Sequence, residues 1–431
     1  MFKTFVNAFK QKEVRNKLLL TLLLLFIYCV GCWLPLPGLD IDLFRNEIED
    51  GNDFLSLLSA ISGGALANGA ILALGVSPYI TASIIIQLLT IAIPSLEKLS
   101  KEGGEAGRKK INLITRWIAL GLSFAQAIGI VLAFQKHLNP AVLGEGTSTF
   151  LIGAMTVIML TAGGMFTVWI GERITDLGIG NGMSMLIFVG ILSTAVSSIL
   201  NTIMGIGSDP NFIWNILIFI VALLLIFVFI VFMDLSERRI PVQYAKQVKG
   251  RKMYGGQSTY IPVKLNTSGV MPIIFANALV MFPQLISSIF WPDATWYQNV
   301  LGTNSWLYII LTALLILFFA YFYAQITFNT EDISRRIQQN GGFIPGIRPG
   351  KPTTEYLKRV SNRLILFGAI FLSIVALVPS LIFKGIDITS SGSLVSAFSA
   401  TGLLIIVSVA LDFEKRLDAQ LMMRTYKGFL K

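Results

Sequence analysis

Apolar runs of about 20 residues recur from one end of this chain to the other, each long enough to cross the hydrocarbon core of a bilayer. Hydrophobic residues make up 54% of the 431 residues and charged residues only 13%, whereas an average soluble domain is about 25% charged. Because a bilayer core holds no water to hydrogen-bond the backbone, such runs are expected to be helical. The sequence therefore predicts an all-α membrane protein.

Ten runs qualify as transmembrane helices, which places both termini on one side of the membrane. The predicted spans are Leu18–Leu34, Leu74–Ile93, Leu113–Phe134, Phe150–Ile170, Gly182–Leu200, Phe212–Met233, Val270–Phe290, Trp306–Phe328, Leu364–Phe383 and Ser393–Leu411. A division after the fifth span gives an N-terminal half (1–201) and a C-terminal half (202–431). Because five is odd, the second half begins on the opposite face, as in inverted repeats that enclose a central path.

Lysine and arginine are distributed unequally between the two sides. Of the 34 such residues, 30 lie in the termini and the alternate loops of one side, and three lie in the five opposite loops. Cationic flanks remain cytoplasmic, so we predict a protein of the inner (cytoplasmic) membrane with both termini in the cytoplasm. The formal net charge of +10 then reflects topology rather than nucleic-acid binding.

Two predicted cytoplasmic loops, 234–269 and 329–363, are longer than the others, and long loops in compact proteins are often functional. The first contains the strand-like runs IPVQYA and STYIPV on either side of a basic, turn-rich stretch, which predicts a hairpin. The second contains GGFIPGIRPGKPT, whose glycines and prolines predict a turn-rich tip around Arg348.

Between the first two spans lies an apolar but interrupted segment, DFLSLLSAISGGALANGAILAL. Asp53 is suited to cap a short helix from Phe54, and Gly63 and Gly64 are suited to end it. The segment is too polar and too broken to face lipid, so we predict a re-entrant half-helix, a plug helix enclosed by protein or by a water-filled cavity. An amphipathic helix on the membrane surface is the alternative.

Catalytic chemistry is not supported by the sequence. The predicted spans carry no charged residue near their middle, whereas ion-coupled transporters and pumps usually need one. His137 is the only histidine and has no partner residue at metal-ligand spacing. Cys29 and Cys32 form a CxxC within the first apolar run, where burial disfavours the reactive thiolate. We therefore predict neither an enzyme nor a bound cofactor or metal.

Five motifs, taken together, resemble the SecY family of protein-conducting channels. They occur in the family's order and span essentially the whole chain: ALGVSPYITASIIIQLL (73–89), GGEAGRKKI (103–111), GIGNGMSMLIF (178–188), ERRIPVQYA (237–245) and GFIPGIRPG (342–350). The resemblance implies ten helices in two five-helix halves around an hourglass pore. It also implies a passive conduit that passes secretory polypeptides across the membrane and releases hydrophobic segments into lipid.

The resemblance also assigns roles to residues of this chain. An aliphatic pore ring would be formed by Val76, Ile80, Ile187, Ile274, Ala278 and Ile405. A plug at about 54–73 would include Phe54, Leu57, Leu58, Ile61, Gly63 and Gly64. A lateral gate between the second and third and the seventh and eighth spans would carry Gln87, Gln126 and Asn277, which we expect to pair across the seam.

The partners that the resemblance implies are the SecE and SecG subunits, the SecA motor ATPase, the ribosome, signal sequences, unfolded preproteins and membrane lipid. SecA or the ribosome would supply the energy. Both could dock on the basic loops, through Arg251, Lys252, Arg348 and Lys351, since cationic side chains suit the phosphates of ribosomal RNA. A small-solute transporter and a purely structural scaffold are the alternatives: the first requires ionisable groups at the midplane, and the second predicts no pore behaviour.

Overall fold

The computed structural model describes residues 6, 8–37, 59, 62–101, 103–133, 149–204, 212–244, 247–249, 252–254, 258–266, 269, 271–290, 305–385 and 400–428. The chain forms two compact units. Unit 1 comprises Met1–Ile213, Ala278–Tyr308 and Asp387–Lys431, and unit 2 comprises Trp214–Asn277 and Ile309–Ile386. These boundaries differ from those of the predicted halves, 1–201 and 202–431, whose inverted arrangement stays a prediction.

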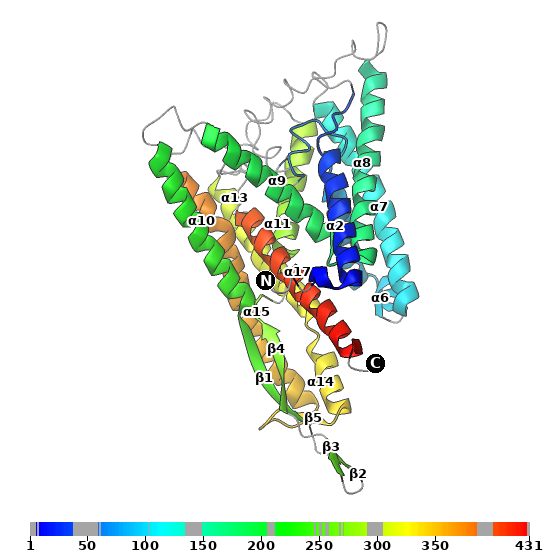
Figure 1. Cartoon of the computed structure of the whole chain (residues 1–431), viewed down its shortest axis with the longest axis vertical. Helices are drawn as coiled ribbons and strands as arrows, with labels where there is room; N and C mark the ends of the chain where they lie inside the picture. Colours follow the sequence, from blue (N-terminus) through cyan, green and yellow to red (C-terminus); the bar gives the residue numbers. More distant parts are fainter. Residues whose placement is uncertain are drawn as a thin grey trace. The chain divides into compact units, whose positions relative to one another are not determined.

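Each of the ten predicted spans coincides at least in part with a helix (Figure 1). The corresponding helices are α2 (Lys12–Gly31), α5 (Ser77–Ala92), α7 (Gly104–Ala133), α8 (Thr149–Leu177), α9 (Gly182–Met204), α10 (Phe212–Leu235), α11 (Met271–Phe290), α13 (Trp306–Thr327), α15 (Lys351–Gly385) and α17 (Ala400–Gly428). Within the described residues, five helices are long and apolar enough to cross a membrane, or six if a bent pair counts as one span. The chain is thus a helical membrane protein, and the count of ten spans stays a prediction.

The bent pair consists of α5 and the short helix α6 (Pro94–Lys101), which meet at an angle of 107°. Pro94 explains the break, because proline at this point cannot donate the hydrogen bond that would continue α5. The start of α5 differs from our prediction. The span was expected to begin at Leu74, but residues up to Val76 form turns and the helix begins at Ser77, where Pro78 is well accommodated in the first turn.

In unit 1, α2 packs against α8 and α9, α5 against α7, α7 against α8, and α9 against both α8 and α17. Glycine allows the closest approach: the α-carbon of Gly182 at the start of α9 lies against the carbonyl oxygen of Gly171 in α8. A separate apolar cluster joins the chain near the N-terminus to α17 and to the α8–α9 connection; its buried members are Ala8, Val14, Leu18, Ile179, Leu417 and Leu421.

Unit 2 contains the predicted hairpin. Strand β1 (Glu237–Tyr244) pairs antiparallel with β4 (Ser258–Lys264), and β2 (Gln247–Lys249) pairs with β3 (Lys252–Tyr254) between them (Figure 1). Along β1, buried Ile240 and Val242 alternate with exposed residues, as expected for a strand with one covered face. The hairpin prediction is confirmed.

The second long loop is more ordered than its sequence suggested, because it contains a helix and a strand. Helix α14 (Thr330–Gln339) begins at Asn329, whose Oδ1 accepts from the backbone N–H groups of Glu331 at 3.1 Å and Asp332 at 3.4 Å. Such capping satisfies amides that a helix start leaves unpaired. Strand β5 (Gly342–Phe343) then pairs with β1, giving the sheet order β4-β1-β5.

An apolar core joins this sheet to α14 and α15. Its buried members are Ile240, Val242, Val263, Ile337, Ile344 and Leu357. The end of β4 is also fixed to the end of α10, because Leu265 N–H donates to the Ser236 carbonyl at 3.0 Å and Asn266 Nδ2 donates to Asp234 Oδ1 at 3.2 Å. We call β1, β4, β5, α14 and the first turns of α15 the sheet region.

Candidate functional site

The segment from Ser62 to Val76, which we call the turn segment, precedes α5 and is largely buried. Two serines, Ser59 just before the segment and Ser62 at its start, hold its first part together by hydrogen bonds. Ser62 Oγ donates to the Ser59 carbonyl at 3.0 Å and accepts from Leu66 N–H at 3.3 Å, and Ser59 Oγ accepts from Ala67 N–H at 3.2 Å. These bonds satisfy backbone groups that neither a helix nor a sheet would satisfy here.

The turn segment is attached to the chain that follows α2. Leu36 N–H donates to the Gly69 carbonyl at 2.8 Å, and Ile71 N–H donates to the Leu34 carbonyl at 2.9 Å. A bridge between Pro35 and Ala70 lies between these two bonds. The chain after α2 and the turn segment therefore run antiparallel, as a short ladder.

Glycines bring the turn segment against the neighbouring helices of unit 1. A Cβ on Gly63 would lie 3.0 Å from the α-carbon of Gly190 in α9, and Gly163 in α8 lies against the carbonyl oxygen of Ile71. Both contacts are with backbone atoms, which cannot rotate away as side chains can. The backbone of the turn segment thus approaches α8 and α9 as closely as glycine permits.

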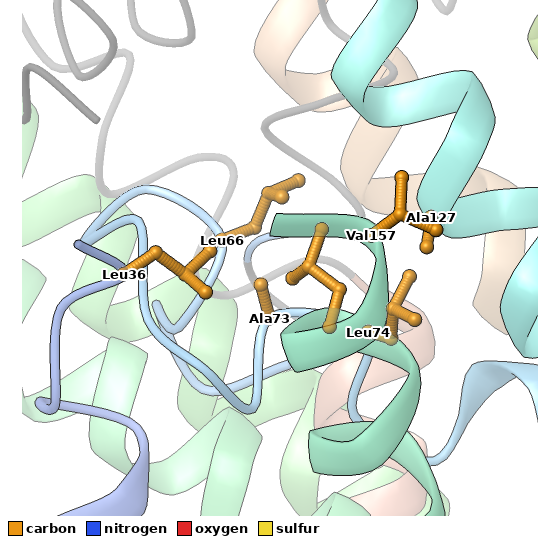
Figure 2. Close-up of a cluster of buried hydrophobic side chains, with 7 residues drawn as sticks. Leu36, Leu66, Ala73, Leu74, Ala127 and Val157 are labelled. Atoms are coloured by element: carbon orange, nitrogen blue, oxygen red, sulfur yellow. The ribbon is translucent and has the colours of Figure 1, made fainter. Parts of the chain in front are cut away.

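An apolar cluster completes the packing of the turn segment on α7 and α8. Its buried members are Leu36, Leu66, Ala73, Leu74, Ala127, Val157 and Leu160. Figure 2 shows the residues of the turn segment beside the helices that carry Ala127 and Val157. The turn segment is enclosed by protein on this side, which agrees with the re-entrant interpretation and not with a surface helix. Residues 62–76 form turns, however, so this part of the predicted half-helix is not helical.

Two of the six predicted plug residues lie in this site. Gly63 and Gly64 have φ values of 77° and 79°, a left-handed conformation that glycine adopts without strain. They turn the chain as predicted. The other four lie outside the described residues: Phe54, Leu57, Leu58 and Ile61.

The predicted pore-ring residues are buried or partly buried. Val76, Ile187 and Ile405 are 2%, 4% and 6% exposed, and α9, which carries Ile187, packs against α17, which carries Ile405. Val76 precedes α5, and its carbonyl accepts from Ile80 N–H at 3.1 Å.

The remaining two ring residues, Ile274 and Ala278, lie in α11 and are partly buried. Ile274 belongs to unit 2 and Ala278 to unit 1. The closure of the ring as a whole therefore stays a prediction.

The predicted lateral-gate residues are partly buried. Gln87 Nε2 donates to Ser83 Oγ at 3.5 Å, one turn earlier in α5, so its described hydrogen bond lies within one helix. Gln126 lies in α7, which packs against α5. In unit 2, Phe275, two residues before Asn277, makes edge-to-face ring contacts with α13. Pairing across the seam stays a prediction.

The predicted docking residues belong to the two loops that meet in the sheet region. Arg348 and Lys351 are exposed, and the Arg348 carbonyl accepts from Thr353 Oγ1 at 2.8 Å. Lys252 lies in β3, and Arg251 lies outside the described residues.

An exposed cation lies on the open face of the hairpin. The Arg239 guanidinium donates to Glu237 Oε1 at 2.8 Å, which raises the pKa of Arg239, and it lies 4.9 Å from the Tyr260 ring centroid. This arginine therefore stays charged and is held at the surface by two contacts.

Residues that were not predicted to belong to the site also contribute. Tyr28 and Cys32 both donate to the Ser62 carbonyl oxygen, and Arg116 of α7 pairs with Glu172 of α8 at 2.6 Å. A tyrosine hydroxyl in an apolar run is a usable signal, because a buried hydroxyl needs a partner. Its partner, Ser62, lies 34 residues further along the chain and cannot be identified from the residues around Tyr28.

The chemistry of the site is that of packing and hydrogen bonding. Among the described residues, no group of three or more His, Cys, Asp or Glu side chains is placed to hold a metal ion.

Solved structures of similar fold include a protein-conducting channel, with a TM-score of 0.66 and 19% identity, covering 93% of this chain and 91% of that chain. A second is a SecY structure (TM-score 0.63, 18% identity, same coverage) whose plug domain is described as stabilising the closed state and maintaining a membrane seal. A third is Sec61 in a canine ribosome–channel complex (TM-score 0.62, 17% identity, same coverage). At these identities the likeness establishes the fold.

Relatives found by sequence are more similar to this chain than these solved structures are. The chain is 41% identical to the protein translocase subunit SecY of Streptomyces galbus, over 100% of both chains, and 39% identical to that of Corynebacterium glutamicum, over 99% of both. The SecY family profile matches residues 70–414. The match includes all six residues of the predicted pore ring. This chain therefore belongs to the SecY family.

Proposed function

We propose that the chain is the channel subunit of a protein translocase in the cytoplasmic membrane, a passive conduit for unfolded secretory polypeptides that also releases hydrophobic segments sideways into lipid. The observation that carries the proposal is identity of about 40% to translocase subunits over the full chain. The buried turn segment supports it, because residues 62–73 of that segment fall within the stretch, about 54–73, that the family resemblance assigns to a plug.

In this proposal the plug and the pore ring seal the idle channel together. A ring of branched aliphatic side chains excludes water from a narrow neck, since an apolar constriction dewets. Val76 is the last residue of the turn segment, and its backbone carbonyl accepts the first hydrogen bond of α5. Displacement of the turn segment would therefore move the ring residue Val76 and be transmitted to the start of α5.

Lateral release requires helices that separate at low cost. We propose that α5 with α7 and α11 with α13 border this exit, and that Gln87, Gln126 and Asn277 bias it. An amide exposed to lipid is costly unless it finds a partner. The bond from Gln87 to Ser83 keeps one amide satisfied in the idle state.

The energy source in this proposal is external: the SecA ATPase or the translating ribosome, in a complex with SecE and SecG. Purified protein reconstituted with SecE, SecG and SecA is expected to import a secretory precursor into vesicles when ATP is added. The measurement is the fraction of precursor protected from external protease. Vesicles lacking this chain are the control, and absence of uptake where a relative's complex is active would refute the proposal.

The sheet region is the proposed docking surface for both energy sources. Changing Arg348 and Lys351 to glutamate together is expected to weaken binding to ribosomes about tenfold or more, because basic side chains neutralise RNA phosphates. The measurement is co-sedimentation of the reconstituted protein with ribosomes over a range of salt concentrations.

A matched control for this test is Lys109→Glu, which reverses an exposed charge in unit 1 that pairs with Glu105 at 3.1 Å. It is expected to leave ribosome binding close to that of the parent. Equal losses in the control and in the double variant would show a non-specific effect of net charge, and the proposed docking role of the tip would be wrong.

A further inference from the structure

One backbone oxygen of the turn segment accepts two side-chain donors from the end of the first transmembrane helix. Tyr28 Oη lies 3.4 Å and Cys32 Sγ 3.7 Å from the carbonyl oxygen of Ser62. Tyr28, Cys32 and Ser62 are 1%, 3% and 3% exposed. A carbonyl this deeply buried has no water to replace a lost donor, so removing both donors leaves it unsatisfied.

Tyr28 lies in the last turn of α2, and Cys32 directly follows the helix as its C-cap with helical backbone angles, so the two donors lie on the same side, as residues four apart do on a helix. Gly31, which lies between them in the chain, also packs against the Leu72 side chain of the turn segment. The segment thus contacts α2 through a hydroxyl, a thiol and an apolar side chain within a short length of helix. This is a defined contact surface and not a single chance approach.

The accepting residue is linked to the start of α5. Gly75 has a φ of 52°, and a Cβ there would lie 3.5 Å from Ser62 Cα and 3.9 Å from the Tyr28 hydroxyl. Ser62, Tyr28 and Gly75 therefore meet at one point, one residue before Val76. Movement of Ser62 away from α2 would remove packing from Gly75, the residue that precedes Val76 of the proposed ring.

Both hydrogen bonds are long, and sulfur is a weak donor. Each bond alone contributes little to stability, whereas together the two bonds satisfy a buried carbonyl oxygen that water does not reach. Contacts of this strength suit an element that must leave its position whenever a polypeptide enters and then return to it.

We propose that Tyr28 and Cys32 are positioning residues that form a latch, holding the turn segment in the closed position by donating jointly to the Ser62 carbonyl. The inference rests on the proposed function and extends it, because it assigns the closed state to two side chains of the first transmembrane helix. Signal-sequence entry would release the latch, and the open channel would lack both bonds.

The test compares Tyr28→Phe, Cys32→Ala and the double variant in reconstituted vesicles. The idle ion conductance is expected to rise slightly in each single variant and severalfold in the double variant, more than the sum, because each donor can replace the other. Acceptance of precursors with defective signal sequences is expected to rise in parallel. The variant Tyr28→Phe with Cys32→Ser, which restores a hydroxyl donor, is expected to return towards the parent.

A second readout follows the latch directly. In a Cys29→Ala background Cys32 is the only thiol of the chain, since it has two cysteines. Its modification by a water-soluble maleimide is expected to be slow in the idle channel and faster either with Tyr28→Phe or during precursor translocation. A merely structural role for Tyr28 would not make the rate depend on translocation.

Thr156→Val is the matched control, because Thr156 Oγ1 is a buried hydroxyl that donates within its own helix to the Ile152 carbonyl at 2.9 Å. It is expected to change neither conductance nor selectivity. If the parent protein translocates a precursor but the double variant conducts and selects as the parent does, the latch is refuted and the channel function stands. If the parent translocates nothing, the proposed function itself fails.

Discussion

Gly163→Ala is expected to lower the free energy of unfolding by about 2 kcal/mol, within the range usual for overpacking a filled interior. The new methyl group would meet the carbonyl oxygen of Ile71, with the carbonyl carbon 2.8 Å away. Ile71 cannot retreat freely, because its N–H is bonded to the Leu34 carbonyl at 2.9 Å. The expected observation is a lower midpoint in thermal unfolding of the purified protein in detergent.

Gly121→Ala provides the control for this experiment. Gly121 is exposed in α7, and a Cβ there would meet nothing within 4 Å. Because alanine is favoured over glycine inside a helix by roughly 0.5–1 kcal/mol, this variant is expected to unfold at the parent temperature or slightly above it. If Gly163→Ala behaved the same way, the seating of the turn segment against α8 would be wrong.

Ile187→Asn is expected to raise the ion conductance of the idle channel about tenfold, because a polar side chain in a narrow apolar neck favours wetting. Ile187 is 4% exposed in α9, and the resemblance assigns it to the pore ring. The measurement is potassium efflux from vesicles that contain the purified complex. Translocation of precursors with weakened signal sequences is expected to increase as well.

Val196→Asn places the same side chain on the same helix, at a position that is 48% exposed. It lies away from the proposed ring, so the idle conductance is expected to match that of the parent. Equal conductance in the parent, Ile187→Asn and Val196→Asn would remove Ile187 from the ring. It would also favour the alternative of a structural scaffold if Ile405→Asn behaved likewise.

Much of the helical framework was predictable, because it depends on local sequence. Apolar runs that a bilayer forces into helices are recognisable one at a time, and every predicted span contains part of a helix. The hairpin in 234–269 was predictable for the same reason, since alternation of buried and exposed residues in β1 is a property of neighbouring residues.

The start of helix α14 is marked in the local sequence, although the helix was not predicted. Asn329 followed by Glu331 and Asp332 is a helix start, with a capping side chain and two acids near the positive end of the helix dipole. The glycines and prolines that follow it predicted only the turn-rich tip around Arg348, where residues 345–350 form turns and a bend. The start of α5 was misplaced because Gly75 adopts a positive φ, which an apolar run does not reveal.

The contacts that define the site were not predictable from one sequence. Tyr28 meets Ser62 across 34 positions, and β5 reaches β1 from about 100 residues further along the chain. Neither pairing leaves a periodic pattern, because each depends on how distant elements pack. The family resemblance supplied the role of the segment, whereas the structure supplied the atoms that hold it.

The central position of β1 in the β4-β1-β5 sheet has a practical meaning for chimeric proteins. Strands β1, β4 and β5, contributed by the two long loops, form one sheet, and the apolar core that covers it includes Val242, Ile344 and Leu357. If only one of the two long loops were replaced by that of a relative, strands from one protein would have to pair and pack with strands from another. Domain-swap experiments should therefore transplant both loops together, since they constitute a single interchangeable part.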